Sequence, residues 1–429
     1  MPGRDGYASG TADGRIVIIS ASIGAGHDGV AAELARRLIG LGFRVDRRDF
    51  LDLLPGPLGR LLRRAYALEL KHAPSTWDWL YTQLDRHPWM SDVAAWLSGM
   101  ASGGIRRITG DGCVAVVSTY PLASQVLGSM RQSGRLSVPA VTYLCDFSVH
   151  RLWVHPGIDG HLAVHKVAAG QAEALGAKGL VVISPAVAPA FGLVSRTPGP
   201  RPGVRERFGL PAQGELALIL AGSWAVGDVE LTAREVLSSG LATPVVVCGR
   251  NTALYERLTR LGIGIALGWV DDMAGLLGAV DVVVHNAGGL SCLEALATEV
   301  PVLVYRCIPG HGHTNAAALV EAGLTVTPAN PQELATMLAA ALDGGLIGEQ
   351  RAATAELYAA PDPAAVVASM AGTPSTGRGR SIPVWRMVAS VVALALASLW
   401  VANSGSSIFS PEGYQCQPEP GVAAAPQPK

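Results

Sequence analysis

Residues Val280 to Gly323 read "VDVVVHNAGGLSCLEALATEVPVLVYRCIPGHGHTNAAALVEAG". A β-branched apolar run ends at His285–Asn286, a glycine turn follows, and a helical pattern then begins. A second apolar run ends at "RCIPGHGHTN", so polar groups again follow a strand. Strands that alternate with helices predict a parallel sheet, and ligands bind such sheets at the carboxyl ends of the strands. The stretch therefore predicts part of an α/β domain with a binding site at this edge.

The same alternation continues on both sides of this stretch. Apolar runs such as "RIVIIS", "VAVVSTY" and "PAVTYLCD" come early in the chain, and "ELALILAGS" and "TPVVVCGR" come later. The Pro- and Gly-rich stretch "SRTPGPRPG" separates the two series and is typical of a linker. We therefore predict two Rossmann-like domains, over residues 15–195 and 204–360, that face one cleft.

Composition excludes some classes of function. The 429 residues carry a net charge of −1, and 16% of them are charged. This balance provides no basic field for nucleic acid. The six cysteines lie far apart and form no C-x-x-C pair, which argues against a zinc site or a disulfide framework. We predict no metal site and no nucleic-acid partner.

A candidate anion site follows the first strand of the quoted stretch. The flexible turn at Gly288 opens a helix near Gly289, whose N-terminal amides and positive dipole end can hold a diphosphate. Ser291 and Glu294 form an S-x-x-E pattern. This pattern has two interpretations. It is either a capping box that satisfies helix amides, or a phosphate donor followed by an acceptor of two ribose hydroxyls.

A second glycine motif lies near the N-terminus. Residues 15–34, "RIVIISASIGAGHDGVAAEL", place Gly24 and Gly26 in a formal G-x-G-x-x-G. A dinucleotide-binding turn is one interpretation, and Asp46 near the end of the next strand would suit a ribose. However, two extra residues widen the turn, and no Gly-Lys-Ser/Thr of a P-loop follows. His27 occupies a turn position where a dinucleotide needs only backbone, so we expect it to be the chemically active member.

These patterns together resemble the glycosyltransferases that make monogalactosyldiacylglycerol and, more distantly, the N-acetylglucosaminyltransferase that completes the peptidoglycan lipid precursor (glycosyltransferase family 28). The resemblance covers about residues 15–360. It is carried by "GAGH" and by "TYLCDFSVHRLWVHPGIDGHLAV", "VVCGRN", "LGWVDDMAGLLGAVDVVV" and "NAGGLSCLEAL". Two places depart from the family pattern. Ala221-Gly222-Ser223-Trp224 replaces a Gly-Gly-Gly loop, and His311-Gly312 replaces a Gln-Glu pair that would contact the donor sugar.

The resemblance implies a GT-B fold and an inverting transfer of a sugar from a UDP-sugar to a hydroxyl of a lipid acceptor. His27 is expected to take the acceptor proton, since an imidazole can do so near neutral pH. The helix dipole would stabilise the leaving UDP, so we expect no metal or other cofactor. The acceptor is expected near Gly24, Gly26, Asp146 and His150. The donor is expected near Gly222, Ser223, Arg250, Trp269, Val270, Gly288, Gly289, Ser291, Glu294, His311 and Asn315.

Two segments outside this pattern suggest contact with a membrane. Residues 53–100 lack a strand signal and combine leucine, tryptophan and basic residues. They suit either a membrane-associating helical insertion or one whose tryptophans pack on the domain. After a linker at 361–381, residues 382–402 are apolar and just long enough for a transmembrane helix. The arginines before it predict catalytic domains on the cytoplasmic side of the cytoplasmic membrane, with a disordered tail at 403–429.

Three alternatives to this reading stay open. One is a membrane-tethered protein that binds a nucleotide sugar without turnover, because the two altered loops set donor contacts. Another is a glycosyltransferase that acts on a small-molecule natural product. The third is an NAD-dependent oxidoreductase, which rests on the N-terminal glycine motif alone. The partners expected under the main reading are a UDP-sugar donor, a lipid acceptor and the cytoplasmic membrane.

Overall fold

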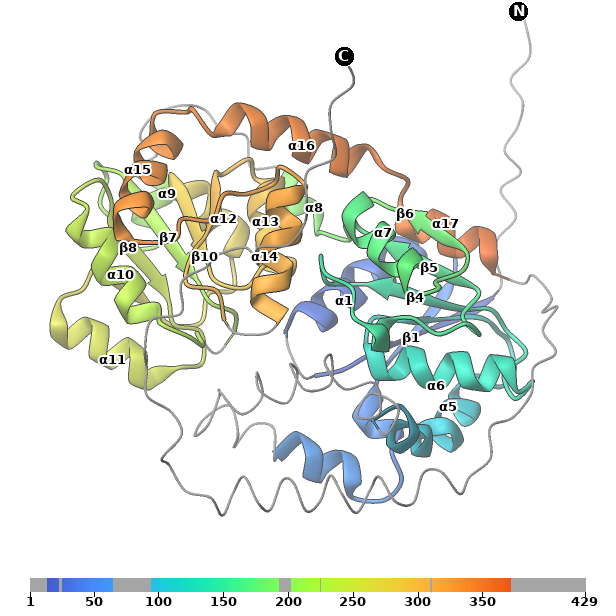
Figure 1. The fold of residues 1–429 in the computed structure, drawn as a ribbon. Coiled ribbons are helices and arrows are strands. Elements are labelled where there is room, and N and C mark those ends of the chain that lie inside the picture. The colour runs from blue at the N-terminus through green and yellow to red at the C-terminus, as the bar shows by residue number, and fades with distance from the viewer. Residues whose placement is uncertain are drawn as a thin grey trace, which may run out of the picture.

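Two parallel β-sheets, each accompanied by helices, form the two halves of the molecule (Figure 1). The computed structural model describes residues 14–22, 25–64, 94–192, 202–223, 225–308 and 311–371. We refer to the half that contains the first sheet as the first domain and to the other as the second domain.

The first sheet has six parallel strands in the order β2-β1-β3-β4-β5-β6. Ile16 and Ile18 of β1 belong to one hydrophobic cluster, and Val17 and Ile19 belong to another. Both faces of β1 are therefore covered, which explains why its sequence is apolar throughout. The strands are β1 (Arg15–Ser20), β2 (Arg44–Asp49), β3 (Cys113–Ser118), β4 (Ala140–Leu144), β5 (Gly160–Ala163) and β6 (Leu180–Val182).

The helices of the first domain connect these strands. They are α1 (Ala25–Gly40), η1 (Phe50–Leu53), η2 (Gly99–Ala101), α5 (Ser102–Ile108), α6 (Pro121–Gln132), η3 (Arg151–Trp153), α7 (Lys166–Ala174) and α8 (Pro189–Gly192). Within the predicted insertion 53–100, residues 58–64 and 94–98 are helical, and residues 65–93 lie outside the described residues. In the helical residues 58–64, Leu61 is 63% exposed and Leu62 is 42% exposed.

The second sheet has five parallel strands in the order β11-β10-β7-β8-β9. The chain changes direction across this sheet between β7 and β10, just as it does between β1 and β3 in the first sheet. Such switch points open a crevice at the carboxyl ends of the strands, where ligands bind in open α/β sheets. The strands are β7 (Leu216–Leu220), β8 (Thr243–Val247), β9 (Ile265–Leu267), β10 (Val282–His285) and β11 (Val302–Val304).

Local caps start several helices of the second domain. Asn251 Oδ1 accepts from Leu254 N at 3.0 Å, and Asp272 Oδ1 accepts from Gly275 N at 2.8 Å. These side chains satisfy amides that the first helical turn leaves without partners. The helices are α9 (Pro202–Glu206), α10 (Val229–Ser238), α11 (Thr252–Leu261), α12 (Met273–Ala279), α13 (Leu290–Ala297), α14 (His311–Glu321), α15 (Pro331–Leu342) and α16 (Ile347–Ala359).

The chain returns to the first domain at its described end. Helix α16 leads from the second domain towards the first, and α17 (Pro363–Met370) packs there (Figure 1). Arg37 of α1 forms an ion pair with Asp362 at 2.8 Å, just before α17. Part of the predicted linker 361–381 is thus a helix. One hydrophobic cluster contains buried residues of both domains, so the two sheets share a continuous core.

The predicted C-terminal transmembrane helix is corrected by the structure. Among the described residues between 14 and 371, no helix is long and apolar enough to cross a bilayer. Residues 382–402, to which the prediction referred, and the tail 403–429 lie outside the described residues. The prediction used an apolar run at the lower limit of length for a span, together with the arginines before it, and such a run is not specific. The described residues form two α/β domains, and the predicted single-pass placement in the cytoplasmic membrane is corrected together with the helix.

Candidate functional site

His27 lies at the switch point of the first sheet. It belongs to the first turn of α1, and its ring lies 5.9 Å from that of Tyr120 and 6.0 Å from that of Trp153, measured between centroids. Thr119 Oγ1, just after β3, donates to the backbone carbonyl of His27 at 3.3 Å. The loops after β1 and β3 therefore hold the imidazole at the carboxyl edge of the sheet.

Within the described part of the chain, the imidazole of His27 also has an unpaired ring nitrogen. Its Nδ1 atom is buried and has no hydrogen-bond partner among the described residues. A buried ring nitrogen without a partner costs free energy, so this imidazole is held in an environment that is unfavourable for it. The arrangement suits a group that accepts a proton from a hydroxyl.

Two further residues predicted for the acceptor lie around Trp153. Asp146 Oδ2 accepts a hydrogen bond from Trp153 Nε1 at 3.1 Å. His150 immediately precedes η3, and its ring lies 6.2 Å from the Trp153 ring. Because Trp153 also contacts His27, Asp146 and His150 form one group with the candidate base.

Five predicted donor residues belong to the loops after β7, β8 and β9. Arg250 N donates to the carbonyl of Ser223 at 2.9 Å, and the Arg250 guanidinium lies 5.1 Å from the centroid of the Trp269 ring. Trp269 is 52% exposed. An exposed indole beside a guanidinium offers a flat surface on which a nucleobase can stack. Gly222 precedes Ser223 in its loop, and Val270 follows Trp269.

The glycine turn after β10 leads into α13. Gly288 and Gly289 have φ angles of +74° and +109°, which only glycine adopts without strain. Gly289 is the N-cap of α13, and no side chain caps this helix. Ser291 therefore lies inside the helix rather than at its cap, and its Oγ bonds to His285 Nε2 at 2.9 Å. The capping-box interpretation of Ser291 and Glu294 is wrong for this geometry.

Glu294 is the fifth of the eight residues of α13. Its carboxyl group is desolvated, and no cation among the described residues offsets the resulting rise in its pKa. Burial raises the pKa of the Glu294 carboxyl to about 7, and no charged group in the described part of the chain offsets this effect. The Glu294 side chain keeps intermediate exposure, so its carboxylate stays within reach of a ligand, and ribose hydroxyls would supply donors that offset its desolvation. Its environment therefore fits the predicted ribose contact.

The N-terminal ends of α1 and α13 meet across the domain junction. A Cβ atom on Gly26 would lie 3.7 Å from Leu290 Cβ, and a Cβ atom on Gly29 would lie 2.4 Å from Leu290 Cδ2. The glycines of the N-terminal motif therefore make room for a side chain of the second domain. This contact brings His27 close to the turn that opens α13, whereas Gly24 lies outside the described residues.

Asn315, predicted to contact the donor, joins the two domains in this structure. Its Oδ1 atom accepts from Ser148 N at 2.7 Å and from Ser148 Oγ at 2.8 Å. Ser148 Oγ also lies 2.8 Å from Thr314 Oγ1. Asn315 is 1% exposed, so its amide oxygen serves the domain contact. His311 begins α14, and its side chain lies outside the described part of the structure.

Three residues of this region were given no role by the sequence patterns. They are His285, Leu290 and Ser148. His285 carried one available signal, since it is a polar residue at the end of an apolar strand, where ligands bind. Leu290 and Ser148 carried none, because their importance lies in contacts between the two domains.

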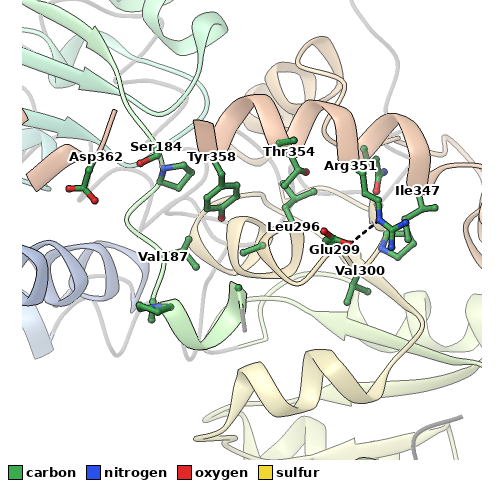
Figure 2. A pocket seen from close by; sticks show the side chains of 18 of the residues that line it. Ser184, Val187, Leu296, Glu299, Val300, Ile347, Arg351, Thr354, Tyr358 and Asp362 are labelled. Carbon is green, nitrogen blue, oxygen red and sulfur yellow. Dashed lines mark ion pairs between the residues drawn. The ribbon is translucent and has the colours of Figure 1, made fainter. Parts of the chain in front are cut away.

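A cavity of about 630 Å³ lies at the opposite end of α13 (Figure 2). Leu296 and Val300 line it near the end of this helix, whereas the candidate donor residues lie at its start. Figure 2 shows Thr354 and Tyr358 of α16 on the same cavity, together with the Glu299–Arg351 ion pair of 3.0 Å. None of the predicted site residues lines this cavity.

Comparisons with known proteins match both domains. Residues 28–182 match the family model of monogalactosyldiacylglycerol synthase, and residues 224–343 match that of group 1 glycosyl transferases. The chain is 26% identical over 227 residues to a processive diacylglycerol β-glucosyltransferase of Bacillus subtilis, covering 51% of this chain and 58% of that protein. It is 25% identical over 350 residues to a Nicotiana tabacum protein named "Probable monogalactosyldiacylglycerol synthase, chloroplastic", covering 76% and 64%. The chain thus spans little more than half the length of the curated bacterial relative.

Solved structures agree on the fold. MurG of Acinetobacter baumannii superposes with a TM-score of 0.51 at 15% identity, over 83% of this chain and 99% of that one. HepE of Anabaena, in complex with UDP, superposes with a TM-score of 0.52 at 16% identity, over 90% and 100%. These likenesses show the two-domain GT-B fold. The two family models add a likeness in sequence to glycosyltransferase families, over residues 28–182 for monogalactosyldiacylglycerol synthase and over residues 224–343 for group 1 glycosyl transferases.

Proposed function

We propose that this chain is an inverting glycosyltransferase that moves a sugar from a UDP-sugar to a hydroxyl of a lipid acceptor. The observation that carries the proposal is the contact of Leu290 with Gly26 and Gly29. It brings the candidate base His27 to the start of α13, one helical turn before the desolvated Glu294. The relatives' names supply the acceptor class, because they are named as acting on diacylglycerol.

The donor-binding residues fit the parts of a UDP-sugar in order. The exposed indole of Trp269, with Arg250 beside it, offers a surface for the uracil. Glu294 offers a carboxylate for the ribose hydroxyls. The N-terminal amides and positive dipole end of α13 offer fixed partial charges for the diphosphate, and Ser223 adds a hydroxyl from the loop after β7.

The chemical step follows from this arrangement. The acceptor hydroxyl gives its proton to His27 while its oxygen forms a bond to the anomeric carbon. The bond between that carbon and the phosphate oxygen breaks on the opposite face, and its electrons leave with UDP. The configuration at the anomeric carbon is therefore inverted. The start of α13 stabilises the charge that develops on the leaving diphosphate. Transition states of glycosyl transfer have oxocarbenium character. Desolvation of the site lowers the local dielectric constant and therefore strengthens the stabilisation of the diphosphate charge by the helix.

A transfer assay on the full chain tests the proposal. The protein is incubated with radiolabelled UDP-glucose or UDP-galactose and with diacylglycerol in detergent micelles, and the lipid fraction is counted. We expect label in the lipid from one donor. A thermal-shift series with UDP and NADH accompanies the assay, and UDP at 100 times its dissociation constant should stabilise the protein by about 2.7 kcal/mol. UDP binding without transfer to any acceptor would leave a nucleotide-sugar binder. Stabilisation by NADH alone would point to an oxidoreductase.

A further inference from the structure

The turn that opens α13 is organised around His285, a residue that the catalytic scheme above does not use. His285 is the last residue of β10 and is 2% exposed. The backbone N–H groups of Ala287 and Gly288 both lie 3.0 Å from its Nδ1 atom. An amide nitrogen can only donate, so Nδ1 must be the unprotonated acceptor of both bonds.

This requirement fixes the tautomer of the ring. A neutral imidazole with an unprotonated Nδ1 carries its proton on Nε2, which lies 2.9 Å from Ser291 Oγ. Burial also lowers the pKa of His285 to about 4, so the ring is neutral at pH 7. The Nε2–H group therefore donates to Ser291, and the hydroxyl proton of Ser291 is left to be donated elsewhere.

The same bonds divide the amides of the turn into two sets. Those of Ala287 and Gly288 point at His285 and are used. Those of Gly289, Leu290 and Ser291 donate to no backbone carbonyl within the described ranges. Because His285 accepts from the first two amides, the next three, and the hydroxyl proton of Ser291, remain to be donated to a ligand at the start of α13.

We propose that His285 is a positioning residue of the donor site, which turns the hydroxyl proton of Ser291 towards the diphosphate of the nucleotide sugar. This inference rests on the proposed function. His285 itself touches no substrate. It acts by supplying the donor that occupies a lone pair of Ser291 and by holding the turn in the shape that its two amide bonds require.

The first experiment tests whether His285 orients the hydroxyl of Ser291 or only supports the backbone of the turn. We use calorimetric titration of the full-length protein with UDP and with uridine, which lacks the diphosphate. In His285→Asn, the side-chain oxygen can still accept from the amides of Ala287 and Gly288. The shorter side chain has no donor that reaches Ser291. We expect it to weaken UDP binding about tenfold, because a hydrogen bond to a charged group is lost, and to leave uridine binding unchanged. Ser291→Ala should weaken UDP binding similarly, and the double variant should be no weaker than either single one.

Two further measurements complete the test. His285→Gln places an amide donor near Ser291 and should recover part of the UDP affinity. His161→Gln is the matched control, because His161 is a fully buried histidine on β5 of the first domain, and its loss should leave UDP binding unchanged. The nitrogen NMR shifts of the His285 ring, recorded without ligand between pH 6 and 8, should show a neutral ring protonated at Nε2.

The outcomes distinguish this inference from the proposed function. If UDP binds the wild type and His285→Asn weakens UDP and uridine equally, His285 only braces the turn and the inference is wrong. A ring protonated at Nδ1 would overturn it whatever UDP does. If the wild type binds no UDP, the proposed function fails first, and the inference fails with it.

Discussion

The side chain of Leu290 occupies the space that a side chain on Gly29 would need. A Cβ atom on Gly29 would lie 2.4 Å from Leu290 Cδ2, well inside van der Waals contact. Gly29 lies in α1, two residues after His27, and Leu290 is the first residue of α13. The missing side chain at Gly29 therefore sets how closely the candidate base approaches the candidate diphosphate site.

This relationship predicts the effect of filling the space. Gly29→Leu should separate the starts of α1 and α13 and lower the transfer rate by about 10²-fold, because small misplacements of reacting groups have effects of that size. UDP affinity should change little, since the donor residues lie in the second domain. Steady-state kinetics and UDP titration measure the two quantities.

Rescue and control variants check the same contact. Adding Leu290→Ala to Gly29→Leu should restore part of the rate, because it returns the space. Gly40→Leu, at the other end of α1 where an added Cβ meets nothing within 4 Å, should leave the rate unchanged. A Gly29→Leu enzyme with wild-type rate would show that the contact does not control the approach of the two sites.

His27→Gln should abolish most of the transfer while preserving UDP affinity. Glutamine keeps hydrogen-bonding capacity but cannot take a proton, and general-base catalysis is typically worth 10²–10⁴-fold. The loss should therefore appear mainly in kcat. A near-wild-type rate would reduce His27 to a structural role. Equal loss of UDP binding would instead place His27 at the donor.

Glu294→Gln should stabilise the unliganded protein at high pH and weaken UDP binding. Burial raises the pKa of Glu294 from 4.5 to about 7, so the folded protein binds more protons than the unfolded chain between these values. Wild-type stability therefore falls as pH rises through this window, and the partly buried carboxylate remains charged above it. At pH 8, Glu294→Gln should be more stable by up to about 3 kcal/mol.

Denaturant titrations at pH 5 and pH 8, with and without UDP, measure this reversal. UDP should stabilise the wild type more than Glu294→Gln, because glutamine accepts the ribose hydroxyls less strongly than a carboxylate. Equal stability of the two proteins at pH 8 would show that Glu294 is solvated. Equal affinity for UDP would show that it does not bind the ribose.

His155→Asn should reduce the loss of unfolding free energy that occurs as the pH falls below 6.5. Burial lowers the pKa of His155 from 6.5 to about 4, so the unfolded chain binds more protons between these values and stability falls as pH falls from 6.5 towards 4. Asparagine can still accept from Gly157 N, as His155 Nδ1 does at 3.0 Å, and it does not titrate. The stability difference between pH 7 and pH 5 should therefore be smaller in the variant. An unchanged difference would mean that His155 is charged in the folded protein.

Apolar content alone was an insufficient guide at the C-terminus. The run at 382–402 met a length criterion and predicted a membrane-spanning helix, which the described part of the structure does not support. Residues 363–370 show a related limit. Their sequence follows a proline and precedes a breaker-rich stretch, so it predicts a linker, but packing against α1 makes it helix α17. Burial against a partner overrides weak local signals in such short segments.

The sequence by itself determined the two parallel sheets, the glycine turn before α13 and the residue types at the strand ends. These features depend on backbone preferences and on burial of whole strands, both of which leave a pattern in neighbouring residues. The tertiary structure alone decided which of these residues meet. The contact of Leu290 with Gly29, the bond of Ser148 to Asn315 and the tautomer of His285 all depend on how distant segments pack. No local periodicity records such packing, because each contact is set by the positions of atoms far apart in the chain.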